Sequence, residues 1–247
     1  MDITTHALVL REVNYKEADK ILTVLSPDQG KMTLSARGCR RKNSRIAAGS
    51  QLLVYSEMVL YQIQGRWAIR EANPEQMFWN LRSDVVKLSL ASYFAELAEC
   101  VAQEEEPAPE LCSLILNSFY ALDQLDRPLD QVKSVYELKL MSVSGFAPLL
   151  DACAVCGREP EEPMFHLGEG VLHCRSCRDE LGEGISMPLT RSALAAMRHV
   201  VEGNPKKLFS FRLQPEDQKK MDEACEAFVL TQLERGFRTL DFYKQFT

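Results

Sequence analysis

The sequence has few histidines and none of the short motifs on which many enzymes depend. Its four histidines are scattered, apart from His166 and His173. It contains no phosphate-binding Gly-x-x-x-x-Gly-Lys loop, no Gly-x-Ser-x-Gly nucleophile elbow and no His-Glu-x-x-His metal pair. Its many acidic residues fall at surface positions of expected helices or in the loop at 104–106. We therefore expect no catalytic residues and no enzymatic activity.

The sequence also lacks a long apolar run. No segment approaches the length of a membrane span, and Met1 leads into patterned sequence without a basic and then apolar leader. Apolar residues make up 46% of the 247 positions and charged residues 26%, an ordinary globular composition with enough length for two domains. We expect a soluble, cytoplasmic protein. Four cysteines that stand singly are then interpreted as reduced buried thiols: Cys39, Cys100, Cys112 and Cys225.

The other four cysteines form two Cys-x₂-Cys pairs separated by seventeen residues. The ligand set is Cys153, Cys156, Cys174 and Cys177. A tight turn puts both sulfurs of a pair on one side, so two pairs supply the corners of a tetrahedral Zn²⁺ site. Two disulfides, an iron centre, or His173 replacing one cysteine are the alternatives. The spacing and the expected reducing compartment favour one structural zinc per chain, with no open coordination position.

Acidic residues are missing from one basic stretch of this acidic chain. The net charge is −6, yet residues 1–80 hold 11 lysines and arginines against 8 acidic residues, and no acidic residue lies between Asp28 and Glu57. Five cations fall within residues 37–45, here called the basic loop. Local field, not net charge, steers a polyanion, so a nucleic acid is the candidate ligand. The candidate nucleic-acid-binding residues are Lys31, Arg37, Arg40, Arg41, Lys42, Arg45, Arg66 and Arg70.

A solvated charge run is the simpler interpretation of the basic loop. Three features favour nucleic-acid binding instead. The cations continue onto a strand face at Lys31 and Arg37, Arg66 and Arg70 share a face of a later strand, and small residues let the main chain approach a phosphate. The aromatic residues available for base stacking are Tyr15, Tyr55, Tyr61 and Trp67, although core packing is the commoner use of such side chains.

Residues 1–73 follow a strand pattern. We expect strands at 3–13, 18–25, 31–37, 51–62 and 66–71, joined by short turns and one long basic connection. In the third strand, Met32, Leu34 and Ala36 alternate with polar residues. Five strands in so short a segment favour a small closed barrel of the OB type over an open sandwich. An SH3-like barrel has a similar pattern and is the alternative.

From residue 74 the apolar residues recur at helical spacing. Helices are expected over 86–101, 111–125, 129–145, 191–201 and 216–235, with Thr190 as an N-cap. We predict an α+β multidomain protein with an OB-fold DNA-binding domain at 1–73 and an inserted Cys₄ zinc module at 151–187. The two parts of an α-helical bundle, 74–150 and 188–247, flank that module, and the aromatic tail at 237–246 packs on the bundle.

Several stretches together resemble the RecO family of DNA-repair proteins. They are Tyr15-Lys-Glu-Ala-Asp19-Lys-Ile-Leu, Pro27-Asp-Gln-Gly30-Lys, Ala36-Arg37-Gly38 with the basic loop, and Leu60-Tyr61. Later, Gly145-Phe-Ala-Pro-Leu-Leu-Asp151 leads into the first cysteine pair, and the second pair follows, as in the family's zinc module. The resemblance covers nearly the whole chain in order.

The resemblance implies a recombination mediator that is associated with the nucleoid. RecO proteins bind single- and double-stranded DNA, anneal complementary strands, and act with RecR to load RecA onto DNA covered by single-strand-binding protein. They also engage the acidic C-terminal tail of that protein. The family's DNA contacts map here to Lys31 and the cations of the basic loop, whereas the helical half of this chain is acidic. An OB-fold and zinc-ribbon factor of transcription or translation is the alternative function.

Overall fold

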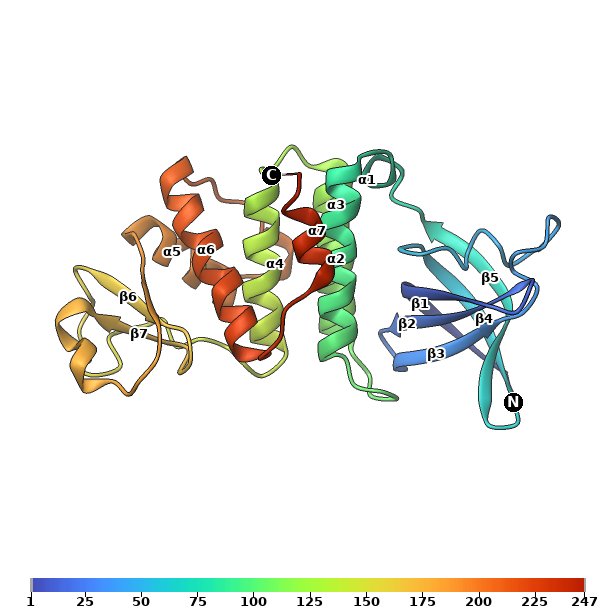
Figure 1. The fold of residues 1–247 in the computed structure, drawn as a ribbon, viewed down its shortest axis with the longest axis horizontal. Helices are drawn as coiled ribbons and strands as arrows, with labels where there is room; N and C mark the ends of the chain where they lie inside the picture. Colours follow the sequence, from blue (N-terminus) through green and yellow to red (C-terminus); the bar gives the residue numbers. More distant parts are fainter. Residues whose placement is uncertain (1, 247) are drawn as a thin grey trace. The chain divides into compact units, whose positions relative to one another are not determined.

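A computed structural model describes residues 2–246, apart from the side chain of Lys206. The chain divides into two compact units (Figure 1). Unit 1 comprises residues 1–124 together with 237–247, and unit 2 comprises residues 125–236. The barrel strands lie in unit 1 and the four paired cysteines lie in unit 2.

Unit 1 begins with a closed barrel of five strands. They are β1 (Asp2–Tyr15), β2 (Asp19–Ser26), β3 (Gly30–Ala36), β4 (Tyr55–Ile63) and β5 (Arg66–Gln76), coloured blue to cyan in Figure 1. Their order is β1-β2-β3-β5-β4, and β1 closes the barrel by pairing with both β2 and β4. A register shift between Val9 and Arg11 marks a bulge, which bends the long β1 between its two partners. The order confirms the predicted OB-type barrel.

Alternating apolar side chains fill the barrel. Met32, Leu34 and Ala36 of β3 are buried, as their alternation predicts. Two residues outside the strands, Cys39 and Ile46, join the same core. The complete cluster is Ala7, Val9, Leu22, Val24, Met32, Leu34, Ala36, Cys39, Ile46, Met58, Leu60, Ile69 and Ala72. Burying one large apolar side chain contributes about 1.5–3 kcal/mol, so the core also holds the segment that carries Cys39 and Ile46.

Three helices and the C-terminal helix complete unit 1. α1 (Trp79–Ser83) is short, α2 (Val85–Val101) packs against β1, and α3 (Pro109–Gln124) packs against α2 and β2. α7 (Arg238–Tyr243) packs against α2. There the hydroxyl of Thr239 donates to Glu96, and the rings of Phe237 and Tyr93 meet edge to face at 5.8 Å. The predicted packing of the aromatic tail on a helix is therefore observed, and the helix is α2.

Unit 2 holds three helices and a small sheet. α4 (Leu129–Val143), α5 (Arg191–Glu202) and α6 (Pro215–Gln232) pack on one another, and η2 (Pro205–Lys207) lies between α5 and α6. Thr190 caps α5, as predicted, because its hydroxyl accepts a hydrogen bond from the N–H of Ala193. Between α4 and α5 come β6 (Pro163–His166), β7 (Val171–Cys174), the 3₁₀ helix η1 (Arg175–Glu180) and β8 (Ser186–Pro188). The sheet order is β7-β6-β8.

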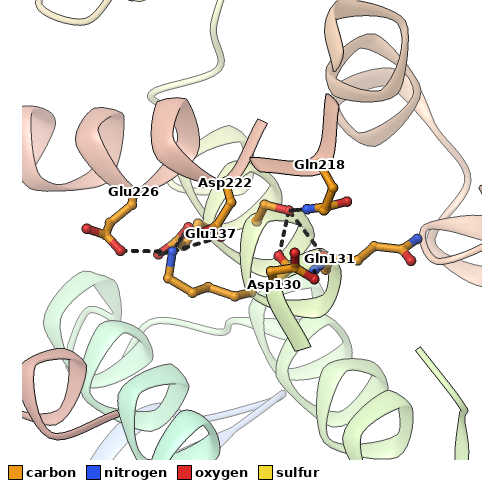
Figure 2. A network of polar contacts seen from close by, with 8 residues as sticks. Asp130, Gln131, Glu137, Gln218, Asp222 and Glu226 are labelled. Atoms are coloured by element: carbon orange, nitrogen blue, oxygen red, sulfur yellow. Dashed lines mark hydrogen bonds and ion pairs between the residues drawn. The ribbon is translucent and has the colours of Figure 1, made fainter. Parts of the chain in front are cut away.

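A buried charged network joins α4 to α6 (Figure 2). The side chain of Lys133 is 2% exposed, and its Nζ lies 3.3 Å from Glu137, 2.9 Å from Asp222 and 3.0 Å from Glu226. Figure 2 shows Asp222 and Glu226 extending from α6 toward the α4 side chains. Two of the three carboxylate partners of this buried cation, Asp222 and Glu226, lie on α6, so the network favours one register of α4 against α6.

The two units divide the helices in a way that the sequence pattern did not indicate. α2, α3 and α7 group with the barrel, whereas α4, α5 and α6 group with the cysteine module. Periodicity shows which face of a helix is apolar, but it does not show which neighbour covers that face. Among residues 2–246, no helix combines the length and the apolar character needed to cross a bilayer.

Candidate nucleic-acid interface and metal centre

The basic loop follows β3 directly, and the barrel holds its main chain in place. Cys39 is 7% exposed and Ile46 is 6% exposed, because both side chains pack into the barrel core. Gly38 adopts φ +67°, a left-handed conformation that favours glycine. Two main-chain hydrogen bonds close turns within the loop. One runs from the N–H of Arg41 to the oxygen of Gly38, and the other from the N–H of Ser44 to the oxygen of Arg41. The loop is therefore an ordered feature of the barrel.

Hydrogen bonds also tie the basic loop to the β1–β2 turn, residues 16–18. The N–H of Gly38 donates to Oδ1 of Asp19 at 2.7 Å. The N–H of Arg40 donates to the main-chain oxygen of Ala18 at 3.0 Å, and its Nη1 reaches the oxygen of Lys16 at 3.4 Å. The turn and the loop therefore lie side by side on the barrel surface.

Most of the predicted cations are exposed on this loop, and their side chains are available to a ligand. Arg40 is exposed, with the single main-chain contact given above. The other four cations of the basic loop are also exposed, and within the described part of the chain their side chains make no hydrogen bond or ion pair: Arg37, Arg41, Lys42 and Arg45. Flexible cations on a fixed main chain suit contacts with phosphates, which carry charge but little shape information.

Two predicted cations are engaged by the protein instead. Lys31 is half-buried, and its Nζ donates to the main-chain oxygen of Glu99 at 3.1 Å. Arg70 is exposed, forms an ion pair with Asp2, and lies with its guanidinium carbon 5.0 Å from the centre of the Tyr61 ring. These contacts leave both side chains less available to DNA than those of the basic loop.

The last predicted cation, Arg66, borders a cavity of about 290 Å³ between β3 and β5. Lys31 and Trp67 also line this cavity, and so do Glu104 and Glu105. The acidic loop reaches this position because the segment at 103–105 forms bridges with the start of β3. Two carboxylates disfavour a phosphate here, so the basic loop is the stronger candidate for the interface.

The aromatic residues considered for base stacking have different surroundings. Trp67 packs against the barrel core, which is the commoner use of such a side chain. Tyr55 stacks on the ring of His6 with centres 5.8 Å apart. Tyr15 is 47% exposed, and Nζ of Lys16 lies 5.2 Å from its ring centre. Of these residues, Tyr15 is the one next to the β1–β2 turn and so near the basic loop.

The four paired cysteines come together in unit 2. Their sulfur atoms all lie within 4.8 Å of one another, and the Sγ atoms of Cys156 and Cys174 are 3.8 Å apart. A tetrahedral zinc with bonds of about 2.3 Å requires sulfur–sulfur distances of about 3.8 Å. The four residues, Cys153, Cys156, Cys174 and Cys177, therefore fit a closed tetrahedral shell around a metal such as Zn²⁺.

The charge of these sulfurs also suits a cation. Burial by itself raises the pKa of the Cys153 thiol. The main-chain N–H groups that donate to its sulfur lower the pKa by more than burial raises it, so the net result is a pKa of about 6. One of these donors is the N–H of Cys174, at 3.3 Å. Burial and the neighbouring sulfurs raise the pKa of Cys174 itself. Four thiolates at this distance repel one another, so a divalent metal supplies the charge that lets all of them ionise.

Local structure explains why the first cysteine pair faces the second. The N–H of Gly157, at φ +70°, donates to the oxygen of Cys153 at 2.9 Å and closes the turn after the pair. The side chain of Arg198 of α5 forms hydrogen bonds with residues before and after this turn. Its Nε donates to the oxygen of Leu150 at 2.7 Å, and its two terminal nitrogens bind the carboxylate of Glu159 at 3.0 and 2.9 Å. The second pair spans the end of β7 and the start of η1.

His173, considered from the sequence as an alternative ligand, has both ring nitrogens occupied. Nδ1 lies 2.8 Å from the main-chain oxygen of Cys174, and Nε2 lies 2.9 Å from the hydroxyl of Ser186. Burial lowers the pKa of His173, which favours its neutral form. The structure therefore leaves the metal shell to the four cysteines.

Two residues of these sites gave no signal in the sequence, Asp19 and Arg198. Both act on main-chain atoms of a distant segment, so no spacing pattern marks them. Asp19 belongs to a stretch singled out for its resemblance to the RecO family, yet nothing in that stretch indicates a contact with Gly38.

The fold and the two sites define a multidomain protein in which an OB-type barrel with a cationic loop is combined with helices and a Cys₄ module. The family model described as Recombination protein O N terminal matches residues 1–78, and the one described as Recombination protein O C terminal matches residues 82–241. The chain belongs to the RecO family, as the sequence resemblance indicated, and its role is in DNA repair and recombination.

Several proteins named DNA repair protein RecO are similar to this chain over nearly its full length. The protein of Heliobacterium modesticaldum is 35% identical over 241 residues, covering 94% of this chain and 86% of the relative. That of Acetivibrio thermocellus is 31% identical over 244 residues, covering 98% and 96%. That of Symbiobacterium thermophilum is 31% identical over 239 residues, covering 95% and 94%.

Proposed function

We propose that this chain is a recombination mediator without catalytic activity of its own, which binds single- and double-stranded DNA through the basic loop and anneals complementary strands. The observation that carries the proposal is the loop itself. Its main chain is fixed by Cys39, Ile46 and the β1–β2 turn, while its cations are exposed. Membership of the RecO family supports a nucleic-acid ligand over a merely solvated loop.

The mechanism we propose is charge neutralisation. Two complementary strands repel each other through their phosphates, and the cations of one loop lower that repulsion while they leave the base edges free to pair. A ligand held by its phosphates is bound with little dependence on its base sequence. Such a process needs neither nucleotide hydrolysis nor a catalytic metal, and the chain contains no phosphate-binding loop for a nucleotide.

Family membership supports further partners. We propose that the chain acts with RecR to load RecA onto DNA covered by single-strand-binding protein, and that it binds the C-terminal tail of that protein through its helices. Its place of action is then the nucleoid. Membership of the RecO family is what supports these partners.

We propose that the Cys₄ module holds one structural Zn²⁺ per chain. Four cysteines complete the tetrahedron, so no position is open for an activated water. The metal would contribute to the folding of the segment from Cys153 to Cys177, whose sheet has only short strands.

Reversing the charge of Arg40, Arg41 and Lys42 together to Glu tests the DNA-binding proposal. We expect the affinity for an oligonucleotide to fall by at least about tenfold at moderate salt, because three attractive contacts become repulsive. The slope of log affinity against log salt should flatten by about two to three, near one for each lost phosphate contact. Fluorescence anisotropy with oligonucleotides of different sequence measures both quantities, and the loss should be similar for each sequence.

A double variant of unit 2 is the control. Lys219→Glu with Lys220→Glu reverses two charges on α6, one on an exposed and one on a half-buried side chain, and we expect it to retain DNA affinity within about threefold. Circular dichroism and metal content should be unchanged in both variants. A folded triple variant with wild-type DNA affinity would show that the basic loop is only a solvated surface.

A further inference from the structure

Asp19 is an acidic residue next to the most basic surface of the chain. It is the first residue of β2, it is half-buried, and its Oδ1 accepts the N–H of Gly38 at 2.7 Å. Glu17 lies two residues earlier in the β1–β2 turn and is exposed. Two acidic residues thus flank one cationic loop, but within the described residues only Asp19 has a hydrogen bond to it.

The hydrogen bond from Gly38 falls at the point where the basic loop leaves β3. Gly38 has the left-handed φ of +67°, and the next residue, Cys39, turns into the barrel core. The N–H of Arg40 then donates to the oxygen of Ala18, beside Asp19. The carboxylate therefore fixes the first turn of the loop, from which Arg40 and Arg41 extend.

We propose that Asp19 is a positioning residue for DNA binding, which holds the basic loop in its binding conformation through the hydrogen bond to the N–H of Gly38. The inference rests on the proposed function, since it assumes that the basic loop contacts DNA. The proposal predicts that removing the Asp19 carboxylate weakens DNA binding. Electrostatics alone predicts the opposite, because the field of a negative charge beside a phosphate-binding loop weakens DNA binding and its removal should tighten it.

Three variants of the full-length chain separate the two effects. Asp19→Ala removes the charge and the hydrogen-bond acceptor. Asp19→Asn removes the charge but keeps an oxygen that can accept the same N–H. Glu17→Gln removes a charge at nearly the same place in the sequence without removing any hydrogen bond to the loop. The probe is a dye-labelled single-stranded oligonucleotide of mixed sequence, and affinity is measured by anisotropy at two salt concentrations.

We expect Asp19→Ala to bind the oligonucleotide about three- to tenfold more weakly than the wild type, the range that one lost hydrogen bond spans. Asp19→Asn should bind within about twofold of the wild type or more tightly, and Glu17→Gln should do the same. Hydrogen exchange supplies a second readout. The amides of residues 38–40 should exchange faster in Asp19→Ala than in Asp19→Asn, because only the former loses the acceptor.

Wild-type or tighter binding by folded Asp19→Ala would overturn the inference, and so would an equal loss in Asp19→Asn. If Asp19→Ala does not fold, Gly38→Ala provides the same test. A Cβ there meets nothing closer than the Arg41 side chain at 3.6 Å, but the φ of +67° is strained for alanine, so the loop turn is disturbed while Asp19 is retained. Its affinity should fall by a similar factor, and wild-type affinity would count equally against the inference.

The triple variant of Arg40, Arg41 and Lys42 belongs in the same experiment, because it separates failure of this inference from failure of the proposed function. If the triple variant loses affinity and Asp19→Ala does not, the loop binds DNA without needing Asp19. If the triple variant keeps its affinity, the proposed interface itself is wrong.

Discussion

Replacing Lys133 by methionine should destabilise unit 2 strongly, and the loss should depend on pH. The lysine is 2% exposed and forms ion pairs with Glu137, which is 0% exposed, and with Asp222 and Glu226 on α6 (Figure 2). Methionine fills a similar volume but leaves three carboxylates without their cation. Removing one partner of a buried ion pair costs about 3–5 kcal/mol. For a chain of this size that corresponds to a fall in melting temperature of about 6–20 °C near neutral pH.

The sign of the pH dependence follows from the pKa shifts. Burial alone lowers the pKa of Lys133, but its three carboxylate partners raise it above the ordinary value. The stabilisation that the ion pairs of Lys133 contribute is complete below the pKa of an unfolded lysine. It is lost only as pH rises through the pKa of the folded state, so it is constant near neutral pH. Burial raises the pKa of Asp222, and Lys133 offsets part of this rise. Without the lysine, the pKa of that carboxyl should rise further.

A carboxyl with a raised pKa stabilises the folded state at low pH and loses this contribution as pH rises through its folded pKa. The Lys133→Met variant should therefore become less stable as pH rises above the ordinary carboxyl pKa of about 4, by about 1.4 kcal/mol per pH unit for each carboxyl that keeps its proton in the folded state. The wild type should show a smaller slope over the same pH range. Urea unfolding followed by circular dichroism at several pH values measures both slopes.

Lys219→Met is the matched control for this prediction. Its side chain is 74% exposed and lies 4.0 Å from Glu223 on the same helix, so it should change the stability by less than about 0.5 kcal/mol at any pH. If Lys133→Met melts within about 2 °C of the wild type at pH 7.5, or if its stability has the pH slope of the wild type, the buried carboxylates do not depend on the lysine in the way described.

Two further predictions concern the metal and the absence of catalysis. Purified protein should contain about one zinc per chain by elemental analysis. Cys153→Ser should lower both the metal content and the melting temperature, because metal binding is part of the folding free energy. A metal-free wild-type protein with the same melting temperature would contradict this prediction. Annealing of complementary strands should proceed without nucleotide and without added Mg²⁺, and ATP hydrolysis by the pure chain would count against the proposed mechanism.

Local patterns in the sequence were sufficient to predict the barrel, the basic loop and the cysteine cluster. The alternation of Met32, Leu34 and Ala36 predicted a buried strand face because side chains in a strand point to opposite sides at successive residues. Each Cys-x₂-Cys pair needs only its own turn to place two sulfurs together, and the spacing between the pairs predicted that they meet in one cluster. The alternation and the turns depend on residues that are neighbours in the chain.

Tertiary structure alone decided which polar residues meet. Lys133 and Glu137 have the spacing of an exposed pair on a helix, yet both are buried because α6 covers them and supplies Asp222, which is 89 positions away from Lys133. Lys31 is a predicted DNA contact, and the fold gives its Nζ an acceptor that the sequence did not indicate, the main-chain oxygen of Glu99. Periodicity records whether a position faces the core or the solvent. A partner distant in the chain is specified by how the elements pack, because a buried polar group must be satisfied by whatever that packing brings to it.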